Sequence, residues 1–169
     1  MAEKKSKILD KIQIAQKIDR MAYQIIENNF DEKELILIGL RVQGFFLAER
    51  LKKVLDKITK AKVLVYAMEL DKESPNEASI KFDFDVKCLE NKVVVLVDDV
   101  ANSGKVLTYS LIPLLKVFPK KIQAAVLVDR KHKSFPVTTD YVGLSLATTM
   151  QKHITVEIGG KGEDAVYLS

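Results

Sequence analysis

Hydrophobic residues follow two different spacings along this chain. Three segments repeat apolar side chains every three to four positions, as amphipathic helices do: residues 8–28, 44–58 and 106–118. Four others are short apolar runs, as expected for strands buried on both faces: residues 35–40, 62–68, 93–97 and 122–128. Alternating apolar residues predict one further strand over 80–86, and Ser74-Pro75-Asn76 predicts a turn.

This order of elements predicts an α/β fold with a mostly parallel sheet and helices on both of its faces. The chain has 169 residues, enough for one compact core, so residues 1–169 are expected to form a single domain. Short strand-like pieces fill residues 137–168, around Gly143 and Gly159-Gly160. Ligands of such folds bind beyond the carboxyl ends of the parallel strands.

The composition of the chain limits the classes of protein to which it can belong. The net charge is +4, from 27 basic and 23 acidic side chains, which permits attraction to phosphates without indicating nucleic-acid binding. No apolar run reaches membrane-spanning length, and no signal peptide follows the charged first residues. Cys88 is the only cysteine, so no internal disulfide can form. We therefore expect a cytoplasmic protein without a membrane partner.

Candidate chemistry lies where the apolar run 93–97 ends. Asp98 and Asp99 follow it directly, and a short loop with Ser103 and Gly104 precedes the next helix. Two acids at the end of a buried strand are unfavourable without a ligand or a cation. They can accept hydrogen bonds from a sugar diol, while loop amides and the helix dipole hold a phosphate. The pattern predicts a sugar-phosphate site; an ordinary strand–turn–helix connection is the alternative.

The same stretch, residues 93–105, resembles the phosphoribosyl-pyrophosphate (PRPP) loop of type I phosphoribosyltransferases. Residues 125–143, which include Asp129-Arg130-Lys131-His132, resemble the carboxyl-terminal signature of the PyrR family, the pyrimidine-operon attenuators and uracil phosphoribosyltransferases. The run 36–40, followed by Gly44, is similar to the pyrophosphate loop of that family and the helix after it. Together these similarities cover nearly the whole chain in the same order.

The resemblance implies a single-domain type I phosphoribosyltransferase fold with a small, hood-like carboxyl-terminal region. It implies that uracil displaces pyrophosphate from Mg–PRPP to give UMP, with Mg²⁺ bound through PRPP and no separate metal site. Asp98 and Asp99 would hold the ribose hydroxyls, and Asp99 would also steady positive charge on the sugar. The implied PRPP-binding residues are Leu40, Arg41, Ala101, Asn102, Ser103, Gly104 and Lys105. Asp129 and Arg130 would lie near the nucleobase, and the assembly would be a homodimer or a higher oligomer.

The chain departs from the family pattern at several places. The family has Thr-Arg where this chain has Val42-Gln43, and Tyr-Arg-Asp-Asp in the segment 68–72, where Lys72 is the nearby cation. It has Pro-Thr-Ser where this chain has 147–149, and Thr or Ser at the position of Val106. The missing arginines favour a second hypothesis, a weakly catalytic or non-catalytic regulator that binds UMP or PRPP, with RNA as a candidate partner. The intact acids favour the transferase. His153 has no partner in sequence and is expected on an exposed strand.

Overall fold

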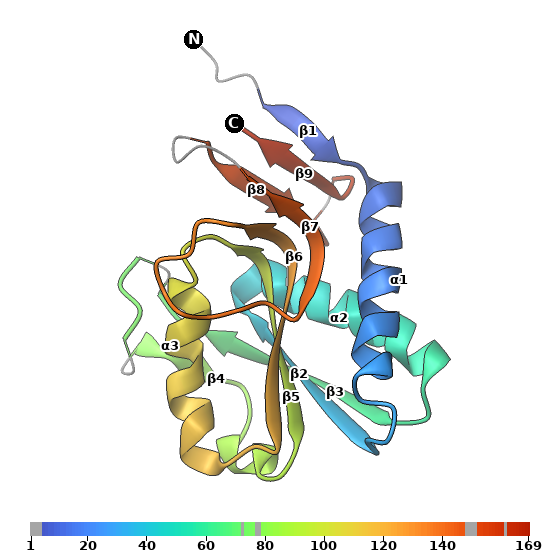
Figure 1. Cartoon of the computed structure of the whole chain (residues 1–169), viewed down its shortest axis with the longest axis vertical. Helices are drawn as coiled ribbons and strands as arrows, with labels where there is room; N and C mark the ends of the chain where they lie inside the picture. Colours follow the sequence, from blue (N-terminus) through green and yellow to red (C-terminus); the bar gives the residue numbers. More distant parts are fainter. Residues whose placement is uncertain (1–4, 72, 77–78, 148–151, 161) are drawn as a thin grey trace.

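A six-stranded sheet forms the centre of the protein, in the order β4-β3-β2-β5-β6-β7 (Figure 1). The computed structural model describes residues 5–71, 73–76, 79–147, 152–160 and 162–169. The parallel strands are β2 (Glu34–Leu40), β3 (Lys62–Glu69), β5 (Val93–Ala101), β6 (Lys121–Arg130) and β7 (Tyr141–Leu146). Among the described strands of this sheet, β4 (Lys81–Phe82), at the β3 edge, is the one that runs antiparallel. The α/β fold with a mostly parallel sheet is therefore confirmed.

Helices cover both faces of this sheet (Figure 1). The helices α1 (Lys11–Glu27) and α2 (Arg41–Ile58) bury their apolar stripes against one face, which presents Leu35 and Leu37 of β2. The helix α3 (Lys105–Leu114) covers the other face, which presents Ile36 and Ile38. Because successive side chains of a strand point to opposite faces, the continuous apolar run supplies both cores.

A second, smaller sheet joins the two ends of the described chain (Figure 1). It has three antiparallel strands in the order β1-β9-β8: β1 (Ser6–Leu9), β9 (Ala165–Leu168) and β8 (Ile154–Glu157). We call these three strands the hood. Their inward side chains, including Ile154, Val156 and Val166, join the core that α1 and α2 bury.

The structure corrects two predicted elements. The segment 8–28 is not helical throughout, because Ile8 belongs to β1 and Asp10 caps the start of α1 by accepting a hydrogen bond from the Gln13 backbone N–H. The predicted strand 80–86 is extended only at Lys81–Phe82. Beyond it, the carboxylate of Asp83 accepts from the backbone N–H of Ala67, which breaks the strand pattern.

Other boundaries shift less. The central strand extends from the predicted 93–97 to Ala101, and α2 begins at Arg41 instead of residue 44. The predicted helix 106–118 ends as an α-helix at Leu114 and tightens into the 3₁₀-helix η3 (Leu115–Val117), just after the buried Pro113. A second 3₁₀-helix, η2 (Val86–Leu89), precedes β5. Within the described residues, no helix is long and apolar enough to cross a membrane.

Candidate functional site

The two acids lie on the last part of β5. Pairing with β6 continues beyond them, since Val100 is in register with Val128 and Ala101 with Asp129. Asp98 is 2% exposed and Asp99 is 9% exposed, and the backbone N–H of Asp99 donates to Oδ1 of Asp98 at 2.9 Å. Two buried carboxylates in sequence concentrate hydrogen-bond acceptors at the carboxyl end of the central strand, where ligands of α/β sheets bind.

A tight loop of three residues, 102–104, connects β5 to α3. The hydroxyl of Ser103 accepts a hydrogen bond from the backbone N–H of Lys105 at 3.3 Å. Gly104 precedes α3 in the left-handed region, at a φ of 82°. A side chain there would also collide with its surroundings, since an added Cβ would lie 2.6 Å from Cγ1 of Val137. The loop thus presents its backbone amides and the start of α3, a combination that suits a phosphate.

A cavity of about 360 Å³ opens between this loop and the hood. One wall is the continuous segment from Asp98 to Leu107, and the opposite wall is formed by His153, Ile154, Thr155 and Val156. The cavity therefore brings together seven of the predicted site residues: Asp98, Asp99, Ala101, Asn102, Ser103, Gly104 and Lys105.

The hood side of this cavity was missed by the sequence interpretation. We expected His153 on an exposed strand without a partner, and it is exposed, but it faces the same cavity as the acids. No local signal could have identified this residue, because more than fifty positions separate it from Asp98. The pairing of β8 with β9, and of β9 with β1, positions β8 and with it this wall of the cavity.

The predicted pyrophosphate loop lies at the neighbouring strand end. Gly39 of β2 is in register with Val97 of β5, so Leu40 and Arg41 lie beside the acids without lining the cavity. Arg41 is exposed and has a positive φ of 55°, an uncommon conformation for a residue with a side chain. A Cβ on Gly44 would lie 2.5 Å from the carbonyl oxygen of Val97, so a glycine there lets α2 pack directly on the central strand.

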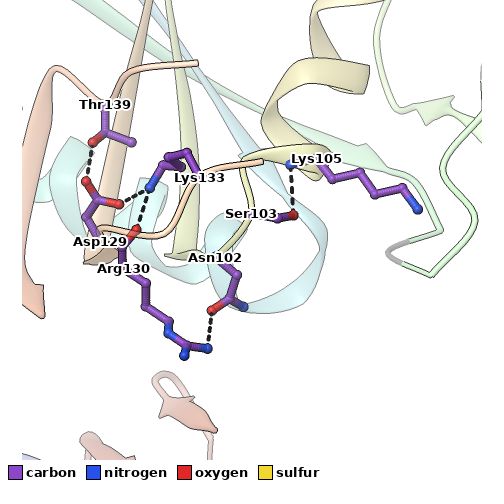
Figure 2. Close-up of polar contacts among 7 residues, drawn as sticks. All are labelled: Asn102, Ser103, Lys105, Asp129, Arg130, Lys133 and Thr139. Atoms are coloured by element: carbon purple, nitrogen blue, oxygen red, sulfur yellow. Dashed lines mark hydrogen bonds and ion pairs between the residues drawn. The ribbon is translucent and has the colours of Figure 1, made fainter. Parts of the chain in front are cut away.

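Asp129 and Arg130 are the last residues of β6 and do not line the cavity. Figure 2 shows their partners: the Asp129 carboxylate accepts from Nζ of Lys133 and, at 2.9 Å, from Oγ1 of Thr139. Arg130 donates from Nη1 to Oδ1 of Asn102 at 3.2 Å. The end of β6 is thus connected to the loop after β5.

The residues that depart from the family pattern lie in different surroundings. Gln43 does not point at the loop; its Oε1 accepts from the backbone N–H of Ile158 in the turn after β8, at 3.0 Å. Val42 is 64% exposed. Lys72, Thr148 and Thr149 lie outside the described residues.

The side chains in the described part of the chain determine how a metal ion could be held. No group of three or more His, Cys, Asp or Glu side chains there could hold an ion. A Mg²⁺ ion at this site would need further oxygen ligands from a polyphosphate and water, in the way that Mg²⁺ is usually held with phosphate substrates.

Comparison with known proteins agrees with this geometry. Residues 5–158 match the family described as phosphoribosyl transferase domain. The chain therefore belongs to the phosphoribosyltransferase family, and its fold is that of the type I enzymes.

Within that family the chain is similar to PyrR. It is 34% identical to the bifunctional protein PyrR of Ligilactobacillus salivarius, over 91% of this chain and 93% of that protein. It is 35% identical to the bifunctional protein PyrR of Clostridioides difficile, over 96% of each. The predicted resemblance to PyrR is confirmed.

Solved structures show the same fold. The hypoxanthine phosphoribosyltransferase of Trypanosoma cruzi superposes with a TM-score of 0.76 at 15% identity, over 95% of each chain. A hypoxanthine-guanine phosphoribosyltransferase of Bacillus anthracis gives 0.69 at 23% identity, over 83% of this chain and 82% of that one. At these identities the likeness concerns the fold alone.

Proposed function

We propose that this protein transfers a phosphoribosyl group from Mg–PRPP to uracil, giving UMP and pyrophosphate. The observation that carries the proposal is the shared cavity, with two buried carboxylates and a phosphate-binding type of loop on the same wall. In the reaction, the bond from the ribose C1 to pyrophosphate breaks and a bond from C1 to a uracil nitrogen forms. The nitrogen loses its proton to water, and the electron pair of the broken bond leaves with pyrophosphate.

The residues of the cavity would act by positioning and electrostatics. Asp98 and Asp99 accept hydrogen bonds from the two ribose hydroxyls, and the negative charge of Asp99 stabilises the oxocarbenium-like sugar. The 5′-phosphate lies in the loop Ala101–Lys105, with the Ser103 hydroxyl as a further donor. Leu40 and Arg41 bind pyrophosphate, mainly through backbone amides, and Mg²⁺ arrives with the PRPP substrate.

The nucleobase would lie at the end of β6, near Asp129 and Arg130, and below the hood strand β8. Uracil is the base we infer, since the relatives named above are PyrR proteins. The assembly inferred from the same resemblance is a cytoplasmic homodimer or higher oligomer.

A second candidate is a weakly catalytic regulator that binds UMP or PRPP, and RNA as a further partner. One relative, 30% identical over 97% of this chain, is the pyrimidine operon regulatory protein of Lactococcus lactis. The observation in favour is the side chain of Gln43, whose oxygen is engaged by Ile158 where the family pattern has an arginine. Arg41 then remains as the basic residue of this turn that could bind pyrophosphate.

The role of the acids is tested by the double change Asp98→Asn and Asp99→Asn, which keeps their shape and removes their charge. We expect PRPP affinity, measured by calorimetry with Mg²⁺, to fall by about 10-fold to 100-fold, because hydrogen bonds to charged groups are the stronger ones. The control is Asp31→Asn with Asp56→Asn, two exposed acids with the same charge change. Equal affinity in both double variants would exclude the assigned role.

Substrate choice is tested by pyrophosphate release with Mg–PRPP and uracil, hypoxanthine, guanine, xanthine, adenine or orotate. We expect release with uracil. Release with a purine alone would retain the reaction and exclude uracil. UMP or PRPP binding without release from any base would favour the regulator.

A further inference from the structure

The segment between β6 and β7 lies across the loop that follows β5. We call residues 131–139 the strap. The backbone N–H groups of Ser134 and Phe135 both donate to the carbonyl oxygen of Ser103, at 2.9 and 3.0 Å. Val137 packs so closely over Gly104 that no side chain fits there. The strap therefore holds the candidate phosphate loop at both Ser103 and Gly104.

Both ends of the strap are tied to one carboxylate (Figure 2). Near its start, Nζ of Lys133 contacts Oδ1 of Asp129 and donates to the carbonyl oxygen of Arg130 at 2.9 Å. At its end, the Thr139 hydroxyl donates to Oδ2 of Asp129 at 2.9 Å. The side chains of Lys133 and Asp129 are 20% and 18% exposed, so the pair is largely shielded from water. Shielded pairs are screened less by salt than surface pairs.

The hydrogen bonds to Ser103 have a geometric consequence for the loop. In a trans peptide the C=O of one residue and the N–H of the next point in opposite directions. The structure contains no cis peptide bond among its described residues. Fixing the Ser103 carbonyl toward the strap therefore fixes the Gly104 N–H on the opposite side of the loop, and Gly104 lines the cavity.

We propose that Lys133 is a positioning residue for PRPP, an inference that rests on the transferase function proposed above. Lys133 acts through the strap: its ammonium group anchors Ser134 and Phe135, their amides hold the Ser103 carbonyl, and the loop amides stay oriented for the 5′-phosphate. Pre-orienting donors in this way lowers the cost of binding an anion. The side chain of Lys133 is engaged by Asp129 and Arg130 and need not touch the substrate.

A simple attraction between a lysine and the phosphates of PRPP makes a different prediction. Lys131 belongs to the same strap, carries the same charge and is exposed. If long-range attraction were the cause, removing either charge would weaken PRPP binding by a similar factor. If positioning is the cause, only the loss of Lys133 matters.

The experiment compares Lys133→Met, Lys131→Met and Lys133→Arg in the full chain. We expect Lys133→Met to raise the KM for PRPP about tenfold, the effect of one hydrogen-bonded contact, with little change in kcat. Lys131→Met should keep the wild-type KM, and Lys133→Arg should recover most of the loss. An equal rise in KM for both methionine variants would overturn the proposal.

Hydrogen exchange of the ligand-free protein supplies a readout that does not depend on activity. We expect the amides of Ser134 and Phe135 to exchange about tenfold faster in Lys133→Met than in Lys131→Met, because opening of the strap exposes them. Unchanged exchange in Lys133→Met would overturn the role of Lys133. A wild-type protein that binds no PRPP would instead contradict the proposed function, even with the expected difference in exchange.

Discussion

Single residues determine the shape of the candidate phosphate loop, and Gly104 is the most constrained of them. Its φ of 82° is unfavourable for any residue with a side chain, and Val137 occupies the place of a Cβ. We expect Gly104→Ala to lower the free energy of unfolding by about 1–2 kcal/mol, from the left-handed backbone alone. PRPP affinity should fall as well, because relief of the collision moves the loop. Urea unfolding and calorimetry measure the two effects.

Gly162→Ala is the control for this change, since no atom lies within 4 Å of an added Cβ there and its φ is not positive. It should leave both quantities within error of the wild type. If the two alanine variants were equally stable, the strain assigned to Gly104 would be absent.

The elements predicted best are those whose sequence pattern arises from burial of the element itself. Four of the five parallel strands, β2, β3, β5 and β6, were found because burial of both faces leaves continuous apolar runs such as Val93–Val97. The fifth, β7, was expected only among short strand-like pieces, because its burial alternates. The strand prediction for residues 80–86 was wrong because the alternation there has another cause. Phe84 stacks on Tyr66 at a ring-centroid distance of 4.5 Å, and the segment is a strand only at Lys81–Phe82. Such aromatic packing and a strand face leave the same pattern in the sequence.

The starts of three neighbouring strands are connected by one acid, which gives a pH-dependent prediction. Glu34 of β2 pairs with Lys92, just before β5, at 3.0 Å and with Lys62 of β3 at 3.6 Å. The hydrogen bond from Lys92 is the main cause that lowers the pKa of Glu34 below its ordinary value of 4.5. Because folding lowers the pKa of Glu34, the contribution of its ion pairs to stability is present above about pH 4.5. It is lost as the pH falls through the pKa of Glu34 in the folded protein.

Glu34→Gln should therefore cost up to about 1 kcal/mol at pH 7, the upper range for such pairs at a protein surface. The difference from the wild type should shrink toward zero as the pH falls well below 4.5. Chemical unfolding at pH 7 and at lower pH measures this difference, with the exposed Glu90→Gln as the control. A cost that does not depend on pH would show that packing, not charge, is responsible.

At the scale of the whole molecule, the cavity depends on contacts between the ends of the described chain. The acids and the loop after β5 were predictable because one continuous stretch, 93–105, carries them. The wall formed by His153 and Thr155 was not, because β8 reaches the cavity only through the hood, in which Ser6 is in register with Leu168. Pairing between such distant residues leaves no periodic signal in a single sequence.

The hood is held on α2 by three side chains of one helix face, and this attachment can be tested. Arg50 pairs with the buried Asp164 at 2.6 Å, and the ring of Phe46 lies against Gly159. Gln43 accepts from the backbone N–H of Ile158 at 3.0 Å. Since Ile158 is 1% exposed, loss of this acceptor would leave a buried N–H without a partner.

We therefore expect Gln43→Leu, which keeps the size of the side chain, to lower the free energy of unfolding by about 1–3 kcal/mol. The amide of Ile158 should exchange faster with solvent, and UMP affinity should fall more than PRPP affinity, because β8 faces the cavity on the side opposite the phosphate loop. Gln16→Leu, at an exposed position of α1, is the matched control. If Gln43→Leu were as stable as that control, the hood would be held by its apolar packing on the core, and the turn after β8 would contribute nothing to the shape of the cavity.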